Sequence, residues 1–253
     1  MTTHRALVRA FLIAQVAAAI PACAGAARTA GPALQPLSPD AAEWTRNPLQ
    51  WQETETGLRH DGRPATLAVY AAARSCRAVT VEADIEVERS QGDSWKIAGV
   101  AIAADEANFW HVALVEAPEE QGREHRMELA EMHEGTWLSH NTLERTADES
   151  PATEWSFGTP YRLRLTLTPE GIEGTVRTAD GTLCYRRGFR FSAPAVTAGR
   201  PALRAGGLRA TYRALRAAWD APIPESPAPR VPAYHSASSV DAVRGQKTGF
   251  FHL

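Results

Sequence analysis

Short runs in which apolar and polar residues alternate fill the middle of the chain and limit what it can fold into. The clearest run is VEADIEVER (81–89), whose carboxylates fall on every second position: Glu82, Asp84, Glu86 and Glu88. Successive side chains of a β-strand point to opposite faces, so this run predicts a strand with one polar and one apolar face. Similar runs recur between turn signals such as Asp61-Gly62, a spacing typical of sandwiches. We therefore expect an all-β fold, an antiparallel β-sandwich.

One segment near the end of these runs fits two structures. In GGLRATYRALRAAWD (206–220) the apolar residues are spaced as on one face of a helix: Leu208, Tyr212, Leu215 and Trp219. The same residues also fit two closing strands, because Gly206-Gly207 is typical of a turn between neighbouring strands of a sheet. We favour the strands.

The N-terminus has the layout of a secretory signal peptide, which we assign to residues 1–26. Basic residues precede an apolar run that ends at Ile20, and small residues follow it. That run is shorter than the roughly 20 residues of a membrane span. We therefore expect an exported protein that is periplasmic, at the cell surface or extracellular. The stretch IPAC also resembles a bacterial lipobox, in which a lipid on Cys23 would be the only contact with a membrane.

Changes in composition mark the remaining boundaries of a chain of 253 residues, which is long enough to bury one sizeable core. Residues 27–47 are rich in proline, alanine and polar residues and predict a linker, whereas residues 48–222 hold the strand-like runs. Further prolines predict a stiff linker after the sandwich, and the chain then ends on the apolar sequence GFFHL. We assign residues 223–253 to this linker and to the start of a missing domain.

Charge and motifs argue against several classes of function. The formal net charge of -2 gives no electrostatic reason to expect nucleic acid as a partner. The sequence has no G-x-S-x-G motif, Walker loop or dinucleotide fingerprint, so nucleophilic and nucleotide chemistry are not expected. No tight metal-ligand spacing occurs either. We predict no metal site and no cofactor, with calcium left open.

Two cysteines remain after removal of the signal peptide, Cys76 and Cys184. Two thiols in an oxidising compartment predict a disulfide between them. The alternative is two separately buried thiols that act as small hydrophobic side chains.

Four stretches carry a resemblance to known domains: VEADIEV, GVAIAADEANFWHVALV, MELAEMHEGTW and PYRLRLTLTPEGIEGTV. Their order resembles the concanavalin A-like and laminin G-like jelly rolls, especially the 3-keto-disaccharide hydrolase-like domains, over roughly residues 48 to 222. The resemblance implies a jelly-roll β-sandwich found in or beside glycoside hydrolases. Separately, KTGFFHL resembles the first strand of agarase-like glycoside hydrolase barrels.

The acidic run offers a candidate catalytic strand. Glu82, Asp84 and Glu86 resemble the E-x-D-x-E strand of lichenase-like jelly-roll glycosidases, in which the first Glu is the nucleophile and the last the acid/base. Such enzymes need a pair of carboxyl groups in a walled cleft. No aromatic residue follows the run to build a wall, and we favour an ordinary outer strand with no catalytic residue.

The hairpin from Ala107 to His133 offers a candidate binding face. We pair Glu116 with Glu124 across its loop, which fixes the face of every other side chain. One face then carries the side chains best suited to sugar hydroxyls and ring faces: His111, His125, Glu131 and His133, with Trp137 nearby. The alternative is a set of scattered polar residues on a half-exposed sheet.

These observations favour an exported carbohydrate-recognising module, accessory to a glycoside hydrolase, with a polysaccharide or oligosaccharide as its partner. One rival is that the sandwich is itself a glycan hydrolase. The other rival is a structural or protein-interaction domain of the laminin G-like kind.

Overall fold

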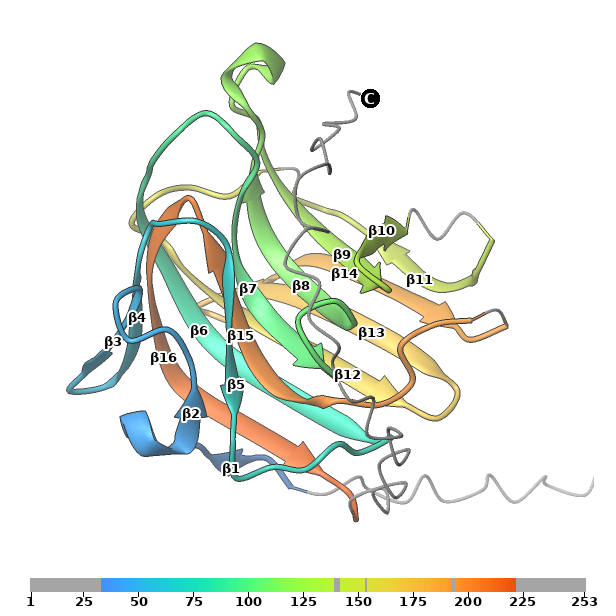
Figure 1. Cartoon of the computed structure of the whole chain (residues 1–253). Coiled ribbons are helices and arrows are strands. Elements are labelled where there is room, and N and C mark those ends of the chain that lie inside the picture. Colours follow the sequence, from blue (N-terminus) through green and yellow to red (C-terminus); the bar gives the residue numbers. More distant parts are fainter. Residues whose placement is uncertain (1–32, 139–141, 153, 193, 222–253) are drawn as a thin grey trace, which may run out of the picture. The chain divides into compact units, whose positions relative to one another are not determined.

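The computed structural model describes residues 33–138, 142–152, 154–192 and 194–221. They form two antiparallel sheets stacked face to face (Figure 1), which confirms the predicted β-sandwich. The predicted signal peptide, Cys23 and the C-terminal segment 223–253 lie outside the described residues. No helix among the described residues is long and apolar enough to cross a membrane.

The larger sheet has nine strands. In spatial order they are β11 (Glu144–Glu149), β14 (Leu183–Arg190), β13 (Gly171–Thr178), β12 (Pro160–Thr168), β6 (Val79–Ser90), β16 (Leu208–Trp219), β4 (Gly57–Asp61) and β3 (Trp51–Thr54), with β1 (Gln35–Pro36) also beside β16.

The smaller sheet has seven strands. Their order is β10 (Thr136–Leu138), β9 (His125–His133), β8 (Phe109–Glu116), β7 (Lys96–Ala103), β15 (Arg200–Gly206), β5 (Thr66–Tyr70) and β2 (Trp44–Thr45). Two single-turn 3-10 helices complete the described elements, η1 (Ala41–Glu43) and η2 (Glu119–Gln121).

The sandwich begins earlier than the composition indicates. Segments that we assigned to a linker pair with the sheets, since β1 lies beside β16 and β2 beside β5. Trp44 of β2 is only 4% exposed and packs edge-on against the Tyr70 ring at 5.2 Å between centroids. Burial of this tryptophan fixes the segment to the sheet, and a composition argument that counts prolines does not detect it.

The core lies between the sheets, where the apolar half of each alternating strand points. The apolar residues of β6 are all buried: Val81, Ala83, Ile85 and Val87. Leu163 and Leu165 of the neighbouring β12 lie in the same cluster as Val100 and Val112 of the other sheet. Burying such side chains contributes about 1.5–3 kcal/mol each, so the period-two pattern predicts which face of each strand turns inward.

The ambiguous segment 206–220 is a strand, but the sheet neighbours that we expected are wrong. Strand β15 pairs with β7 and β5 in the smaller sheet, whereas β16 pairs with β6 and β4 in the larger one. Gly207, with a φ of 68°, links the two strands and so carries the chain from one sheet to the other. Leu208 and Tyr212 are fully buried because this crossing lies against the core.

The predicted disulfide is wrong. Cys76 and Cys184 are both free and buried, which agrees with the alternative of two separate thiols. Cys76 forms an isolated bridge with Gly199, whereas Cys184 lies within β14. Burial raises the pKa of the Cys76 thiol to about 11, and the nearby Asp220 carboxylate adds to the shift.

The carboxylates of VEADIEVER all face away from the core, and they contact arginines of the adjacent strands β12 and β16 and of β4, one strand further. Glu82 contacts Arg164 Nε at 2.7 Å and Arg216 Nε at 3.6 Å. Further along the row, three more ion pairs form across the sheet: Asp84 with Arg162 at 2.7 Å, Glu86 with Arg213 at 2.7 Å and Glu88 with Arg59 at 2.5 Å. The acidic run is therefore one half of a cross-strand ladder of ion pairs.

Two substitutions in this ladder test whether a buried ion pair contributes more to the free energy of unfolding than an exposed one. We expect Glu82→Gln to lower the free energy of unfolding by about 2 kcal/mol, because the Glu82 side chain is only 3% exposed and serves several arginines. Glu86→Gln, whose side chain is 30% exposed and meets one arginine, is expected to cost less than about 1 kcal/mol. Urea denaturation of both variants measures the difference. Equal losses would contradict this account of the ladder.

Candidate functional site

The pairing of β8 with β9 decides which side chains reach the outer face of the smaller sheet. Glu116 pairs with His125 and Phe109 with Met132, one residue away from the register that we predicted. The loop is closed by a hydrogen bond from Ala117 N to Glu124 O at 2.9 Å. A shift of one residue turns every β9 side chain to the opposite face.

This register divides the predicted binding face. Glu131 is buried between the sheets, where it accepts a hydrogen bond from Val196 N. His125 lies flat on Trp155, with ring centroids 3.9 Å apart, and its Nδ1 is 2.8 Å from the Trp155 carbonyl oxygen. His133 lies at the end of β9 and is partly exposed. The structure brings together only His111 and Trp137, whose ring centroids are 5.2 Å apart on the outer face.

The outer face of the smaller sheet carries a groove of about 510 Å³, and Trp137 is part of its lining. It is lined by Ala65, Trp95, Lys96, Ile97, Val115, Arg126, Glu128, Ala130, Trp137, Leu138 and Arg204. Trp95 and Trp137 are the large aromatic residues of this lining, and they remain 44% and 48% exposed. Single exposed apolar side chains are ordinary, but exposed apolar surface gathered in one groove is a mark of a binding site.

Small residues form the middle of the sheet face beneath the groove. Across the strands, Arg204 lies opposite Gly99, Gly99 opposite Ala113, and Ala113 opposite Glu128. A Cβ added at Gly99 would lie 2.3 Å from Val112 O, so only glycine fits there. Three strand spacings of about 4.8 Å put the backbones of Arg204 and Glu128 about 14 Å apart, with no large side chain between them in this row.

Charged side chains stand at the edges of this floor and contact rings. The Arg126 guanidinium carbon lies 4.2 Å from the centroid of the Trp95 ring. The Arg204 guanidinium carbon lies 4.5 Å from the Phe109 centroid and 5.4 Å from that of Trp137. Both contacts are cation–π interactions, which hold a guanidinium over a ring while its N–H groups stay available.

A buried histidine holds the groove carboxylate. His111 Nε2 is 3.1 Å from Glu128 Oε1, and His111 Nδ1 has no hydrogen-bond partner among the described residues. Burial lowers the pKa of His111, although Glu128 acts in the opposite direction. Burial alone would raise the pKa of Glu128, but the hydrogen bond with His111 and the positive charges of Arg126 and Arg204 lower it overall. We infer that a neutral His111 donates its Nε2–H to an ionised Glu128.

Sequence reasoning missed most of this groove. The error of one residue in the register puts Arg126 and Glu128 on the face opposite to the observed one, and the candidate binding residues did not include Trp95. Arg204 was detectable, because it is the polar residue inside the otherwise apolar interior of β15.

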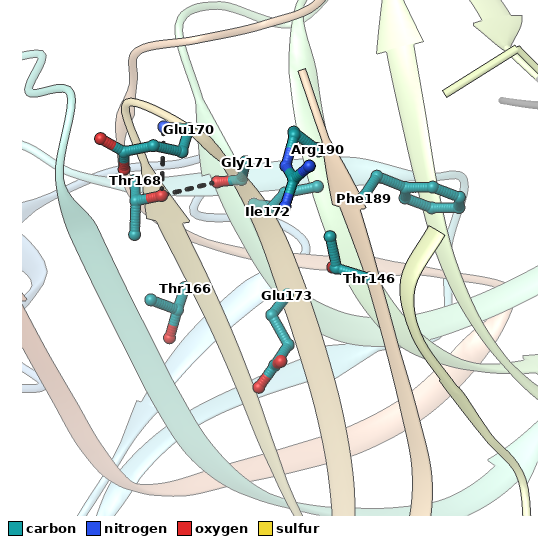
Figure 2. Close-up of a pocket in the computed structure, with 9 residues that line it drawn as sticks. All are labelled: Thr146, Thr166, Thr168, Glu170, Gly171, Ile172, Glu173, Phe189 and Arg190. Atoms are coloured by element: carbon teal, nitrogen blue, oxygen red, sulfur yellow. Dashed lines mark hydrogen bonds between the residues drawn. The ribbon is translucent and has the colours of Figure 1, made fainter. Parts of the chain in front are cut away.

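A second hollow, of about 360 Å³, lies on the outer face of the larger sheet. Figure 2 shows its lining of threonines and charged side chains, with Thr168 hydrogen-bonded to the backbone of Glu170 and Gly171. Arg190 and Glu173 already have partners, Glu144 and Arg186, each at 2.9 Å. The only aromatic in its lining, Phe189, is 4% exposed. The groove with two exposed tryptophans is therefore the stronger candidate site.

Potential metal ligands are scattered over the described residues. Within residues 33–221, apart from the gaps given above, no three His, Cys, Asp or Glu side chains gather in a way that could hold a metal ion.

Comparisons with solved structures show the fold. A mutant of the GH43 protein BlXynB from Bacillus licheniformis matches with a TM-score of 0.50 and 12% identity, over 70% of this chain and 36% of that one. The carbohydrate-binding module CBM66 from Bacillus subtilis matches with a TM-score of 0.49 and 13% identity, over 70% of this chain and 95% of that module. This chain thus spans about a third of the GH43 protein. No protein-family model and no curated protein matches it.

The buried His111 predicts a pH dependence of stability. Its folded-state pKa lies below the ordinary value of 6.5, so the unfolded chain takes up a proton that the folded chain does not. Its contribution to stability is complete above that value and is lost as the pH falls toward the folded-state pKa. His60, whose pKa burial also lowers, acts in the same direction.

The variant His111→Gln keeps an amide donor for Glu128 but removes the titration. We expect its free energy of unfolding to fall less steeply than that of the wild type between pH 7.5 and 5.5, by up to about 1.4 kcal/mol per pH unit. Urea denaturation at the two pH values measures this. Equal slopes for the two proteins would show that His111 is not held neutral.

Proposed function

We propose that this protein is a carbohydrate-recognising β-sandwich that binds a polysaccharide or oligosaccharide in the groove of its smaller sheet. The observation that carries the proposal is the pair of half-exposed tryptophans, Trp95 and Trp137, which line one groove together with charged side chains. The similarity in fold to the GH43 protein is consistent with this role.

The chemistry of the groove fits sugars. The C–H faces of a sugar ring pack against flat aromatic rings, and its hydroxyls exchange hydrogen bonds with charged and polar side chains. Trp95 and Trp137 provide the rings, Arg126 and Arg204 provide donors, and Glu128 provides an acceptor.

The wider role is also a proposal. We propose that the protein is exported, and that it is accessory to a glycoside hydrolase whose barrel begins in residues 223–253. Within jelly rolls it resembles the 3-keto-disaccharide hydrolase-like and laminin G-like domains. The residues that support the export signal and the barrel lie outside the described part of the chain.

The acidic row Glu82, Asp84 and Glu86 has a structural role in this proposal. Each of these carboxylates is ion-paired with an arginine of a neighbouring strand. A glycosidase needs two carboxyl groups that flank the sugar in a cleft, and none of these three residues lines either of the hollows described above. We therefore propose sugar binding rather than hydrolysis.

We further propose that binding requires no metal. Arginine, glutamate and tryptophan side chains of the groove suffice for the contacts described above. Affinities measured in EDTA and in millimolar calcium are expected to agree, and a loss of binding in EDTA would assign calcium to the site.

Tryptophan substitutions test the groove directly. A glycan array and affinity electrophoresis on plant and algal polysaccharides first identify a ligand. We expect Trp95→Ala and Trp137→Ala each to weaken binding of that ligand by about tenfold, because each removes a stacking surface. Isothermal titration calorimetry measures the change.

Phe157→Ala is the matched control, because Phe157 is a 41% exposed aromatic that does not line the groove. Its affinity should equal that of the wild type. The proposal fails if no polysaccharide binds, or if both tryptophan variants bind as tightly as the control.

A further inference from the structure

The surroundings of the arginines in the larger sheet can be compared with those of the arginines in the groove. Most arginines of the larger sheet meet a carboxylate within 4.0 Å, as Arg162 meets Asp84 and Arg213 meets Glu86, both at 2.7 Å. The groove of the smaller sheet differs. Among the described residues, neither Arg126 nor Arg204 has a carboxylate within ion-pair distance, and both lie over aromatic rings instead.

Arg204 is the less solvated of these two cations. Its Nε is buried and has no hydrogen-bond partner among the described residues. Burial lowers the pKa of Arg204 to about 10, against the opposing effect of the Glu128 charge. A guanidinium removed from water without a bound anion costs free energy, which an anion entering the groove would recover.

The other charges of the groove do not supply that anion. Glu128 is held by His111 at 3.1 Å and stands on the far side of the small-residue floor from Arg204. Lys96, the third cation of the lining, is fully buried and forms its own ion pair with Glu116 at 2.8 Å. The groove therefore presents two unpaired arginines and one carboxylate that already has a partner.

We propose that this groove selects acidic glycans, with Arg204 binding a carboxylate or sulfate group of the sugar and Arg126 binding a second one along the chain. This inference rests on the proposed function and specifies its ligand class. The guanidinium fork of arginine matches the two oxygens of a carboxylate or sulfate. Because Arg204 lies 5.4 Å from the centre of the Trp137 ring, an acidic group on a sugar packed at Trp137 would be adjacent to it.

Matched pairs of polysaccharides test the charge of the ligand while keeping its backbone. Polygalacturonate and its methyl ester differ only in the carboxylate, and carrageenan and chemically desulfated carrageenan differ in the sulfate. We expect the acidic member of at least one pair to bind at least tenfold more tightly at low salt. We also expect this preference to shrink as sodium chloride is raised, since salt screens exposed charges.

Arginine substitutions connect the preference to the groove. We expect Arg204→Gln and Arg126→Gln each to remove about tenfold of the affinity for the acidic glycan, with little effect on the neutral one. Arg204→Lys, which keeps the charge but not the fork, should lose less. Arg145→Gln makes the same change in net charge at a 53% exposed site on the other sheet and should keep the full preference.

If Arg204→Gln fails to fold, the Arg126→Gln variant still tests the inference, because the Arg126 side chain is at the exposed rim of the groove. Tight, tryptophan-dependent binding of the neutral glycans alone would overturn this inference and leave the proposed function intact. Equal binding of polyglutamate, or a preference that survives both arginine substitutions, would also overturn it. Absence of binding to every glycan would overturn both proposals.

Discussion

The pairing of β8 with β9 determines what the smaller sheet presents to solvent. In the observed register, Met127 and Leu129 point into the core, where they are 8% and 5% exposed, while Arg126 and Glu128 point outward. A slip by one residue would bury the two charges and expose the two apolar side chains. Burying an uncompensated charge costs more free energy than a favourable turn geometry contributes. Burial therefore determines the register, and the loop adopts the conformation that this register requires. The same register places Arg126 and Glu128, the β9 residues that must face water, in the lining of the groove.

The charged side chains on the outer faces of the two sheets have different partners. On the larger sheet, carboxylates of β6 are paired with arginines of the flanking strands β12 and β16. On the smaller sheet, arginines lie over tryptophan and phenylalanine rings, and the strands between them carry Gly99 and Ala113. In the larger sheet, the charged side chains use their hydrogen-bonding groups on each other and so link the strands. In the smaller sheet, hydrogen-bond donors, the exposed parts of the aromatic rings and the volume of the groove remain available to a ligand, as a binding surface requires.

The β-sandwich could be predicted from sequence because alternation is a local property, and the same alternation placed the apolar side of VEADIEVER in the core. Details that depend on partners distant in the chain could not be predicted. The arginines that pair with Glu82 come from β12 and β16, about 80 and 130 residues later, and nothing near Glu82 indicates them. The crossing at Gly207 and the free thiols likewise depend on which strands become neighbours. For the candidate site, an error of one residue in one hairpin was enough to divide the predicted face, so that only His111 and Trp137 of the predicted residues lie together on the outer face.

The groove concentrates features that a protein selected for stability alone would remove. Larger apolar side chains around the hollow would fill it with apolar contact, and a carboxylate near Arg204 would satisfy its buried Nε. Both improvements are absent at the same place. Natural chains depart from such rules chiefly where function requires it. Missing volume alone would indicate any ligand, and a missing anion alone would indicate a counterion from solvent. Their coincidence beneath two half-exposed tryptophans favours a ligand that has both an apolar ring face and a negative charge.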